Sequence, residues 1–302
     1  MNTCAFKRLT IIGTGLIGGS LAMAAREMYE DLWIQAVDVN GEALQYLLKA
    51  RTVDEVSLTI PSAFEEDHLI ILACHLSQSL EALKELAPKV KGKAITVSDV
   101  GSCKRAIGAL GKEVLPGQFI GAHPLSGKEF SGTAHAASLL FANKSYILCP
   151  TLTPSDTVEK DNPTLSILID FFKGLGASPR ILDAETHDLY MAYMSHLPQL
   201  YAILLTNLLS NHQPGHLLSY HGGGIDDQLR LSASPYAMWK DVFAQNKDNM
   251  DRVTSELAEL LTQAPQVLNN PDLAQWFNRS NQLHQQFQAL KKPAEPVFNS
   301  SL

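Results

Sequence analysis

The stretch "LTIIGTGLIGGSLAMAA" (residues 9–25) decides the fold. An apolar, β-branched run enters a glycine-rich turn, and a run of helix-forming residues leaves it. Gly13, Gly15 and Gly18 have the spacing GxGxxG. Between a strand and a helix, the first glycine permits a tight turn, the second lets the backbone approach a pyrophosphate, and the third allows close helix–sheet packing. The helix start adds N–H groups and a positive dipole, which favour a phosphate.

The next strand-like run supplies the second half of this dinucleotide fingerprint. "WIQAVD" (residues 33–38) ends at Asp38, 20 residues after Gly18, where an acid hydrogen-bonds the ribose hydroxyls. Asp38 would repel a 2′-phosphate, and Val39 and Asn40 offer no arginine to bind one, so NAD is favoured over NADP as the cofactor. The alternative is a purely structural glycine turn. The expected cofactor-binding residues are Gly13, Gly15, Leu16, Ile17, Gly18 and Asp38.

Outward from this unit, short β-branched runs alternate with helical patterns. The expected strands are "LTIIG", "WIQAVD", "LIILAC", "AITVSD", "QFIGA", "SYILCP" and "SPRILD". Such alternation is typical of βαβ units and a parallel sheet covered on both faces. We therefore predict an α/β Rossmann-type dinucleotide-binding domain over residues 1–182.

Beyond residue 182 the strand pattern disappears and the helical period takes over. Residues 184–211 are too apolar for a lone surface helix, so we expect them in the middle of a helical domain or against a second subunit. We predict an all-α domain over residues 183–292 and a disordered, Pro-rich tail over 293–302. Residues 153–164 are expected to form a polar loop before another helix.

Composition and charge argue against several classes of protein. The chain has 302 residues and a net charge of −7 without a basic run, so we do not expect nucleic acid as a partner. Its apolar runs fall short of the ~18 residues of a membrane span, and no signal-peptide pattern precedes the first strand, so we expect a cytoplasmic protein. Cys4, Cys74, Cys103 and Cys149 form no CxxC pair, which favours reduced thiols over disulfides or a zinc site.

Three loops follow the carboxyl ends of expected strands, where ligands bind in sheets of this kind. His123 in "GAHPLSGKEFSG" (residues 121–132) directly follows a strand, and Pro124 fixes the exit of the chain. A near-neutral imidazole there suits the base that takes a hydroxyl proton during oxidation to a carbonyl. Ser102 in "SDVGSCK" (residues 98–104) is either functional or an ordinary helix N-cap. His75 is expected to be a solvated loop residue.

Five segments together resemble the prephenate/arogenate dehydrogenase family of tyrosine biosynthesis. They are "GTGLIGGSLA", "SDVGSCK", "GAHPLSGKEFSG", "SHLPQ" (residues 195–199) and "DDQLRLSASPYAMWKDVFAQN" (residues 226–246). The resemblance implies an NAD-binding Rossmann-type domain followed by an all-α dimerisation domain, with a homodimer formed through the helices. It also implies NAD-dependent oxidative decarboxylation of prephenate to 4-hydroxyphenylpyruvate and CO2, or of arogenate to tyrosine.

The resemblance also implies roles for single residues. His123 would act on the ring hydroxyl, and Ser102 would contact both that hydroxyl and the cofactor. Arg230 would bind a substrate carboxylate, for which the guanidinium fork is well matched. The other residues expected on the substrate side are Ser126, His196 and Gln199. His196 could instead be a core residue, and Gln199 stands where relatives have a second histidine, which leaves open prephenate or arogenate as the substrate.

Two other functions remain open from the sequence. One is a β-hydroxyacid dehydrogenase-like enzyme, a group that also joins a Rossmann domain to helices but generally uses a catalytic lysine on the helical domain. The other is a non-catalytic NAD-binding sensor. We expect no metal, because His212, His216 and His221 fit no standard zinc spacing and are better explained as parts of a polar loop between helices.

Overall fold

The structure is a computed structural model that describes residues 4–127, 130–150, 162–212, 214–268 and 270–291. Two compact units make up the chain, Met1–Met250 and Asp251–Leu302. Residues 153–161 of the expected polar loop and the expected tail 293–302 lie outside the described residues. The helix expected after the loop begins at Pro163, with Asn162 as its N-cap.

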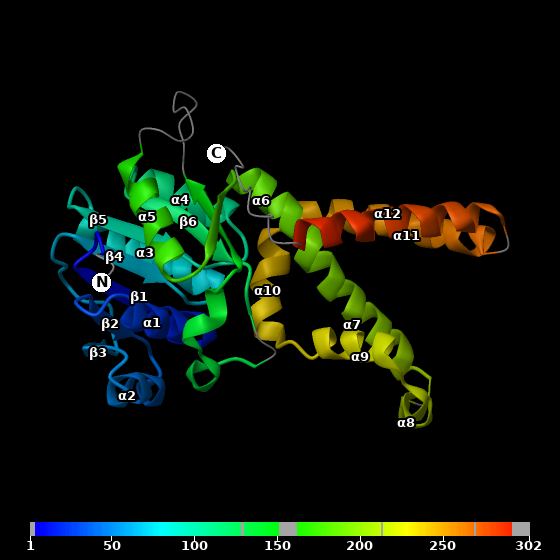
Figure 1. The fold of residues 1–302 in the computed structure, drawn as a ribbon, viewed down its shortest axis with the longest axis horizontal. Coiled ribbons are helices and arrows are strands. Elements are labelled where there is room, and N and C mark those ends of the chain that lie inside the picture. Colours follow the sequence, from blue (N-terminus) through cyan, green and yellow to red (C-terminus); the bar gives the residue numbers. More distant parts are fainter. Residues whose placement is uncertain (1–3, 128–129, 151–161, 213, 269, 292–302) are drawn as a thin grey trace, which may run out of the picture. The chain divides into compact units, whose positions relative to one another are not determined.

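The first unit is built on an eight-stranded sheet with the order β3-β2-β1-β4-β5-β6-β7-β8. From β3 to β6 the strands run parallel, in the doubly wound order of dinucleotide-binding folds (Figure 1). The strands are β1 (Arg8–Ile12), β2 (Trp33–Val37), β3 (Glu55–Ser57), β4 (His68–Leu72), β5 (Ile95–Asp99), β6 (Phe119–Pro124), β7 (Ser145–Pro150) and β8 (Ser178–Ile181).

Helices connect most of these strands and follow the last one. Those among the strands are α1 (Leu16–Met28), α2 (Gly41–Lys49), α3 (Leu76–Val90), α4 (Arg105–Val114), η1 (Thr133–His135), η2 (Ser138–Phe141) and α5 (Pro163–Gly174). Those after β8 are α6 (Ala184–Met191), η3 (Ala192–His196), α7 (Leu197–Ser210), α8 (Pro214–Leu217), η4 (Leu218–Tyr220), α9 (Gly223–Ser232), α10 (Tyr236–Gln245), α11 (Lys247–Val267) and α12 (Asp272–Lys291).

The sheet differs from the expected parallel arrangement at one edge. β7 pairs antiparallel with β6, and β8 pairs parallel with β7, so the last two strands are reversed relative to the others. A parallel neighbour needs a crossover, usually an α-helix, whereas the described part of the β6–β7 connection holds only the short 3-10 turns η1 and η2. β3 is not among the expected strands, because a strand of three residues is too short to give a periodic signal.

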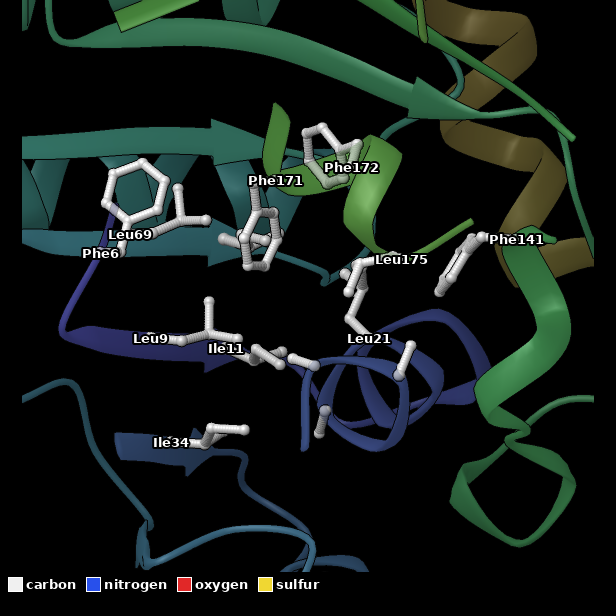
Figure 2. Close-up of a cluster of buried hydrophobic side chains, with 14 of the residues drawn as sticks. Phe6, Leu9, Ile11, Leu21, Ile34, Leu69, Phe141, Phe171, Phe172 and Leu175 are labelled. Atoms are coloured by element: carbon white, nitrogen blue, oxygen red, sulfur yellow. The ribbon is translucent and has the colours of Figure 1, made fainter. Parts of the chain in front are cut away.

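Alternate strand residues supply two apolar cores, one on each face of the sheet. Leu9, Ile11 and Leu69 face α1 and α5, and Figure 2 shows them with Leu21 and Phe171 from those helices. Ile70 and Leu72 lie in the second core, which includes residues of α3 and α4. Because both faces are buried, the strands read as nearly continuous apolar runs.

The glycine-rich turn between β1 and α1 has the geometry that its spacing predicts. Gly13 has φ +98°, a conformation that side chains with a Cβ rarely adopt, and its Cβ would lie 2.6 Å from the carbonyl oxygen of Ala73. A Cβ on Gly18 would lie 1.9 Å from the carbonyl oxygen of Gly13. A Cβ on Gly15 would meet no atom within 4 Å. Gly13 and Gly18 therefore let the backbone pack closely, whereas Gly15 borders open space.

The long apolar run after β8 is not one regular helix. α6 passes into a π-helical turn, η3, which ends at His196, and α7 follows. Pro198 near the start of α7 has no N–H to donate back to the preceding turn, which accounts for a local shift of helical register. π-Turns within helices are frequent at functional sites.

Gly18→Ala should lower the free energy of unfolding by about 3 kcal/mol or more, because the new Cβ overlaps a carbonyl oxygen that cannot move independently of the turn. For a unit of this size the melting temperature should fall by roughly 6–12 °C. Gly15→Ala is the matched control: its Cβ meets open space, and φ is −63°, so only a weaker N-cap remains, at about 1 kcal/mol or less. Thermal unfolding of the two variants tests this, and equal losses would contradict the packing role of Gly18.

Candidate functional site

A buried ion pair joins the carboxyl ends of β5 and β6. The Nζ of Lys104 donates to the carboxylate of Asp99, and both side chains are 0% exposed. Lys104 Nζ also donates to the carbonyl oxygen of Ala122 at 2.7 Å, while the Asp99 carboxylate accepts the N–H groups of Ala122 and Gly101 at 3.0 and 2.8 Å. Since Ala122 precedes His123 and Gly101 precedes Ser102, the pair fixes the backbone beside both predicted catalytic residues.

A second buried carboxylate, Asp188 on α6, lies at the start of α4. It accepts the backbone N–H groups of Lys104 at 2.7 Å and Arg105 at 3.0 Å. The Nε of Arg105 adds a contact at 3.3 Å, and the guanidinium also pairs with Asp248. Free backbone donors at a helix N-terminus favour an anion, which is why a charged carboxylate is accommodated without exposure to water.

Two histidines connect this carboxylate to the predicted base. Nδ1 of His187 lies 2.8 Å from the carboxylate of Asp188. Nε2 of His187 lies 3.0 Å from Nδ1 of His123, and the two rings meet edge to face. His123 is thus the outermost group of a continuous chain of hydrogen bonds that begins at the N-terminus of α4.

His196, at the end of the π-helical turn, is fully buried in the same region. Its Nδ1 lies 3.1 Å from Nδ2 of Asn246, which also donates to the carbonyl oxygen of Asp188 at 2.7 Å. Nε2 of His196 is buried and has no hydrogen-bond partner among the described residues. The ring packs edge to face against Trp239. His196 is thus buried, with one nitrogen held by the protein and the other without a hydrogen-bond partner among the described residues.

The pKa values of these groups favour neutral imidazoles beside an ionised acid. Burial, followed by the neighbouring His187, Lys104 and His196, lowers the pKa of His123 well below its ordinary value. Burial lowers the pKa of His187 against the opposing effect of Asp188, and it lowers the pKa of His196 to about 4. Burial alone would raise the pKa of Asp188, but the hydrogen bonds from His187, Arg105 and Lys104 outweigh it and lower that pKa.

The predicted nucleotide residues gather at the amino end of α1. No side chain caps this helix end, and Gly15 is its N-cap residue. Leu16 and Ile17 begin the helix and pack on the core. The carboxylate of Asp38, at the end of β2, accepts the N–H of Thr14 at 2.6 Å and its hydroxyl at 2.9 Å. An uncapped helix start, an open glycine and an acid at the end of the next strand are the features that a dinucleotide requires, so the residues fit this ligand.

The remaining predicted residues occupy different surroundings. Ser102 is half-buried two residues before Lys104, the N-cap of α4, so the interpretation of Ser102 as that N-cap is wrong. The hydroxyl of Ser126 is buried and lacks a partner among the described residues. Nε2 of Gln199 donates to the carbonyl oxygen of Leu231 at 2.9 Å, which ties α7 to α9. Arg230, on α9, is half-exposed and lies 3.5 Å from Asp227.

Of the histidines outside this cluster, His68 is buried in β4 and those singled out from the sequence lie on the surface. His75 is exposed just before α3, and His212, His216 and His221 are exposed near α8 and α9. His221 contacts Asp226 at 2.8 Å. Among the described residues, no group of three or more His, Cys, Asp and Glu side chains is arranged to hold a metal ion. The helices of this described part are also too short or too polar for an 18-residue apolar stretch able to cross a membrane.

Sequence reasoning missed most of the groups that surround His123. The sequence predicted no role for Asp99, Lys104, His187, Asp188 or Asn246. Asp99 and Lys104 offered a usable signal, because charged residues next to a buried strand end must be paired. His187 and Asp188 gave no such signal, since "ETHD" at the start of a helix reads as an ordinary polar first turn.

Comparison with known proteins identifies both parts of the chain. The family model "Prephenate dehydrogenase, nucleotide-binding domain" matches residues 21–180, and "Prephenate dehydrogenase, dimerization domain" matches residues 183–287. A prephenate dehydrogenase of Bacillus subtilis is 29% identical over 298 residues, which span 96% of this chain and 78% of that one. A prephenate dehydrogenase of Lactococcus lactis is 30% identical over 247 residues, 80% of this chain and 66% of the other.

The fold agrees with these sequence matches. A crystal structure of prephenate dehydrogenase from A. aeolicus, in complex with hydroxyphenyl propionate and NAD+, superimposes with a TM-score of 0.83 at 24% identity, covering 95% of this chain and 100% of that one. At this identity the likeness shows a common fold. With family models matching most of its length in the order predicted, the chain belongs to the prephenate dehydrogenase family.

Proposed function

We propose that the protein catalyses the NAD-dependent oxidative decarboxylation of prephenate to 4-hydroxyphenylpyruvate and CO2. The observation that carries this proposal is a neutral histidine, His123, held at the carboxyl end of β6 by a buried hydrogen-bond chain in a member of this family. The glycine loop and this histidine both lie at the carboxyl edge of the parallel strands, where doubly wound folds bind their ligands. We also propose residues 1–182 and 183–292 as the functional domains.

NAD is the proposed cofactor, held by the turn between β1 and α1. The pyrophosphate would lie on the uncapped N–H groups of α1 beside Gly15, where the backbone is open. Asp38 would accept the ribose hydroxyls and repel a 2′-phosphate, which favours NAD over NADP. The chemistry that NAD supplies when bound is acceptance of a hydride.

His123 takes the proton of the ring hydroxyl as that hydroxyl is oxidised to a ketone. A neutral imidazole is required, and burial keeps the pKa of His123 low enough to provide it. The ring ketone then withdraws the electron pair of the carbon–carboxylate bond, CO2 leaves, and the ring becomes aromatic. Ser102, two residues before the fixed start of α4, would hold the hydroxyl and the cofactor in register.

Recognition of a dianionic substrate by an acidic chain requires local donors. The N–H of His196 is one, because Asn246 engages Nδ1 and leaves Nε2 as a buried donor. The buried hydroxyl of Ser126 is a second. Arg230 would bind a carboxylate through its guanidinium. Gln199 differs, since its amide N–H is committed to Leu231, so it would shape this side of the site by holding α9 near α7.

A homodimer through the helical part is the proposed assembly. α7 presents Leu204 and Leu208 with 56% and 57% exposure, and α12 presents Phe277 and Leu283 with 63% and 68%. Large exposed apolar side chains that gather on a helix mark a surface that another protein covers. The dimerization domain of the family matches these helices. Sedimentation should give twice the chain mass, and a monomer at micromolar concentration would refute this assembly.

The function is tested by incubating the purified protein with prephenate or arogenate, each with NAD or NADP. Prephenate with NAD should give the fastest nicotinamide reduction together with CO2. Arogenate as the faster substrate would replace the proposed substrate, and no reduction in any of the four mixtures would refute the function. His123→Asn should lower kcat by about 10²–10⁴-fold while leaving NAD affinity unchanged. An unchanged kcat would contradict the role of His123 as the base, whereas NAD binding without any turnover in the parent protein would favour the NAD-binding sensor.

The pH profile gives a further check on His123. Because its pKa lies below the ordinary value of 6.5, the base should remain neutral at pH 6.5 and lose activity only in more acidic solution. A kcat/KM that already falls on lowering the pH from 8 to 7 would contradict a base with a depressed pKa.

Arg230→Ala should raise KM for prephenate by roughly 10–100-fold, because a charged hydrogen bond to a carboxylate contributes about 1.5–3 kcal/mol. KM for NAD should change by less than about threefold if the arginine contacts only the substrate. Arg252→Ala is the matched control, since Arg252 pairs with Glu256 on the exposed surface of α11. Equal increases in both KM values for Arg230→Ala would contradict its carboxylate role.

A further inference from the structure

We propose that His187 and Asp188 are positioning residues that hold His123 in the Nδ1–H tautomer, so that Nε2 of His123 is the nitrogen that accepts the substrate proton. This inference rests on the proposed function and deepens it. The structure contains the three side chains in one continuous hydrogen-bond chain, Asp188–His187–His123.

Asp188 determines which groups donate and which accept along this hydrogen-bond chain. Four donors face its carboxylate: the N–H groups of Lys104 and Arg105, Nε of Arg105, and Nδ1 of His187. An ionised carboxylate can only accept, and three of these donors have no alternative role because they are backbone or guanidinium N–H groups. Asp188 therefore stays ionised, and Nδ1 of His187 must carry its proton towards it.

His187 transmits this direction to His123. It is 0% exposed, and burial lowers its pKa more than the carboxylates of Asp188 and Asp99 raise it, so its ring is neutral. A neutral ring with its proton on Nδ1 has a lone pair on Nε2. That lone pair lies 3.0 Å from Nδ1 of His123, so the nitrogen of His123 must donate. With Nδ1 of His123 protonated and the ring neutral, the lone pair of His123 is on Nε2.

The second histidine of the site is held in the opposite tautomer. The side-chain oxygen of Asn246 accepts from Nη2 of Arg105 at 3.3 Å and from Nδ2 of Asn249 at 2.8 Å, which orients the amide. Its Nδ2 then donates to Nδ1 of His196, and the proton of His196 lies on Nε2. His123 thus offers an acceptor and His196 a donor, which suits removal of one proton next to a bound anion.

The proton step balances within this chain. The hydroxyl O–H bond breaks and an N–H bond forms at Nε2 of His123, while the hydride of the same carbon leaves to NAD+. The resulting imidazolium can pass its Nδ1 proton to Nε2 of His187, which places the positive charge next to the carboxylate of Asp188. An ionised acid behind a histidine stabilises the imidazolium in the same way in hydrolase triads, whose tautomer it also fixes.

Asp188→Asn tests this inference, because an amide N–H facing His187 reverses the chain and moves the proton of His123 to Nε2. We expect kcat to fall by about 10²–10⁴-fold with KM for prephenate and NAD affinity nearly unchanged. The loss should persist at pH 9, since a wrong tautomer does not recover on deprotonation. Recovery at pH 9, or a kcat within threefold of the parent protein, would overturn the inference.

Substitutions of His187 separate positioning from packing. His187→Gln can still donate to Asp188 and accept from His123, whereas His187→Leu can do neither, so the glutamine variant should retain clearly more activity. Equal kcat values for the two would overturn the relay. His68→Gln is the control: His68 is another buried histidine, bonded to Thr10 at 2.8 Å in the same sheet, and its substitution should leave kcat within twofold.

The tautomer can also be measured without turnover. In deuterated protein labelled with ¹⁵N at histidine, long-range proton–nitrogen correlation distinguishes the two nitrogens of each ring, and loss of one set in His123→Asn assigns the residue. We expect His123 protonated at Nδ1 near pH 7, and protonation at Nε2 would overturn the inference. A correct tautomer in a protein that oxidises neither substrate would refute only the proposed function. The titratable groups that face the hydrogen-bond chain are Asp99, Lys104, Arg105, His196, Glu185 and Asp248, and all of these side chains are retained in Asp188→Asn.

Discussion

The buried pair of Lys104 and Asp99 is the interaction on which the rest of the site depends. Two charges taken out of water are tolerated only when each is paired and hydrogen-bonded, and removing one partner of such a pair typically costs about 3–5 kcal/mol. Here the two groups also bind the backbone of Ala122 and Gly101, so the ends of β5 and β6 cannot move separately. A Cβ on Gly121 would lie 3.3 Å from the lysine stem, which explains a glycine two residues before His123.

The hydrogen bonds next to this ion pair both pack helices together and position the histidines of the site. The helix start that follows Lys104 supplies the donors for Asp188, and Asp188 in turn holds α6 against α4. The same residue reaches His123 through its carboxylate and His196 through its carbonyl oxygen. One acidic side chain on α6 therefore connects the sheet to the helices that carry the substrate-side residues. The same contacts hold the helices together and orient the catalytic groups. Few of these residues could therefore be substituted singly without affecting both.

Much of the fold could be predicted because its signals are local. The tight turn needs φ +98° at Gly13, and the close approach of the backbone at Gly18 excludes any side chain. The spacing of these glycines in the sequence therefore predicts the backbone geometry of the turn. The strands are also visible in the sequence as apolar runs, because both faces of the sheet are buried. The reversal of β7 could not be predicted in this way, since an antiparallel strand next to β6 has the same apolar pattern as a parallel one. β3 was missed because three residues carry no period.

The sequence by itself determined the dinucleotide fold, seven of the eight described strands and the histidine at the carboxyl end of β6, because each depends on residues adjacent in the chain. Only the tertiary structure decided which nitrogen of that histidine is free. His187 lies 64 positions from His123, and Lys104 lies 84 positions from Asp188. A proton's place on a ring depends on partners within about 3 Å, and such partners are brought together by packing rather than by sequence spacing.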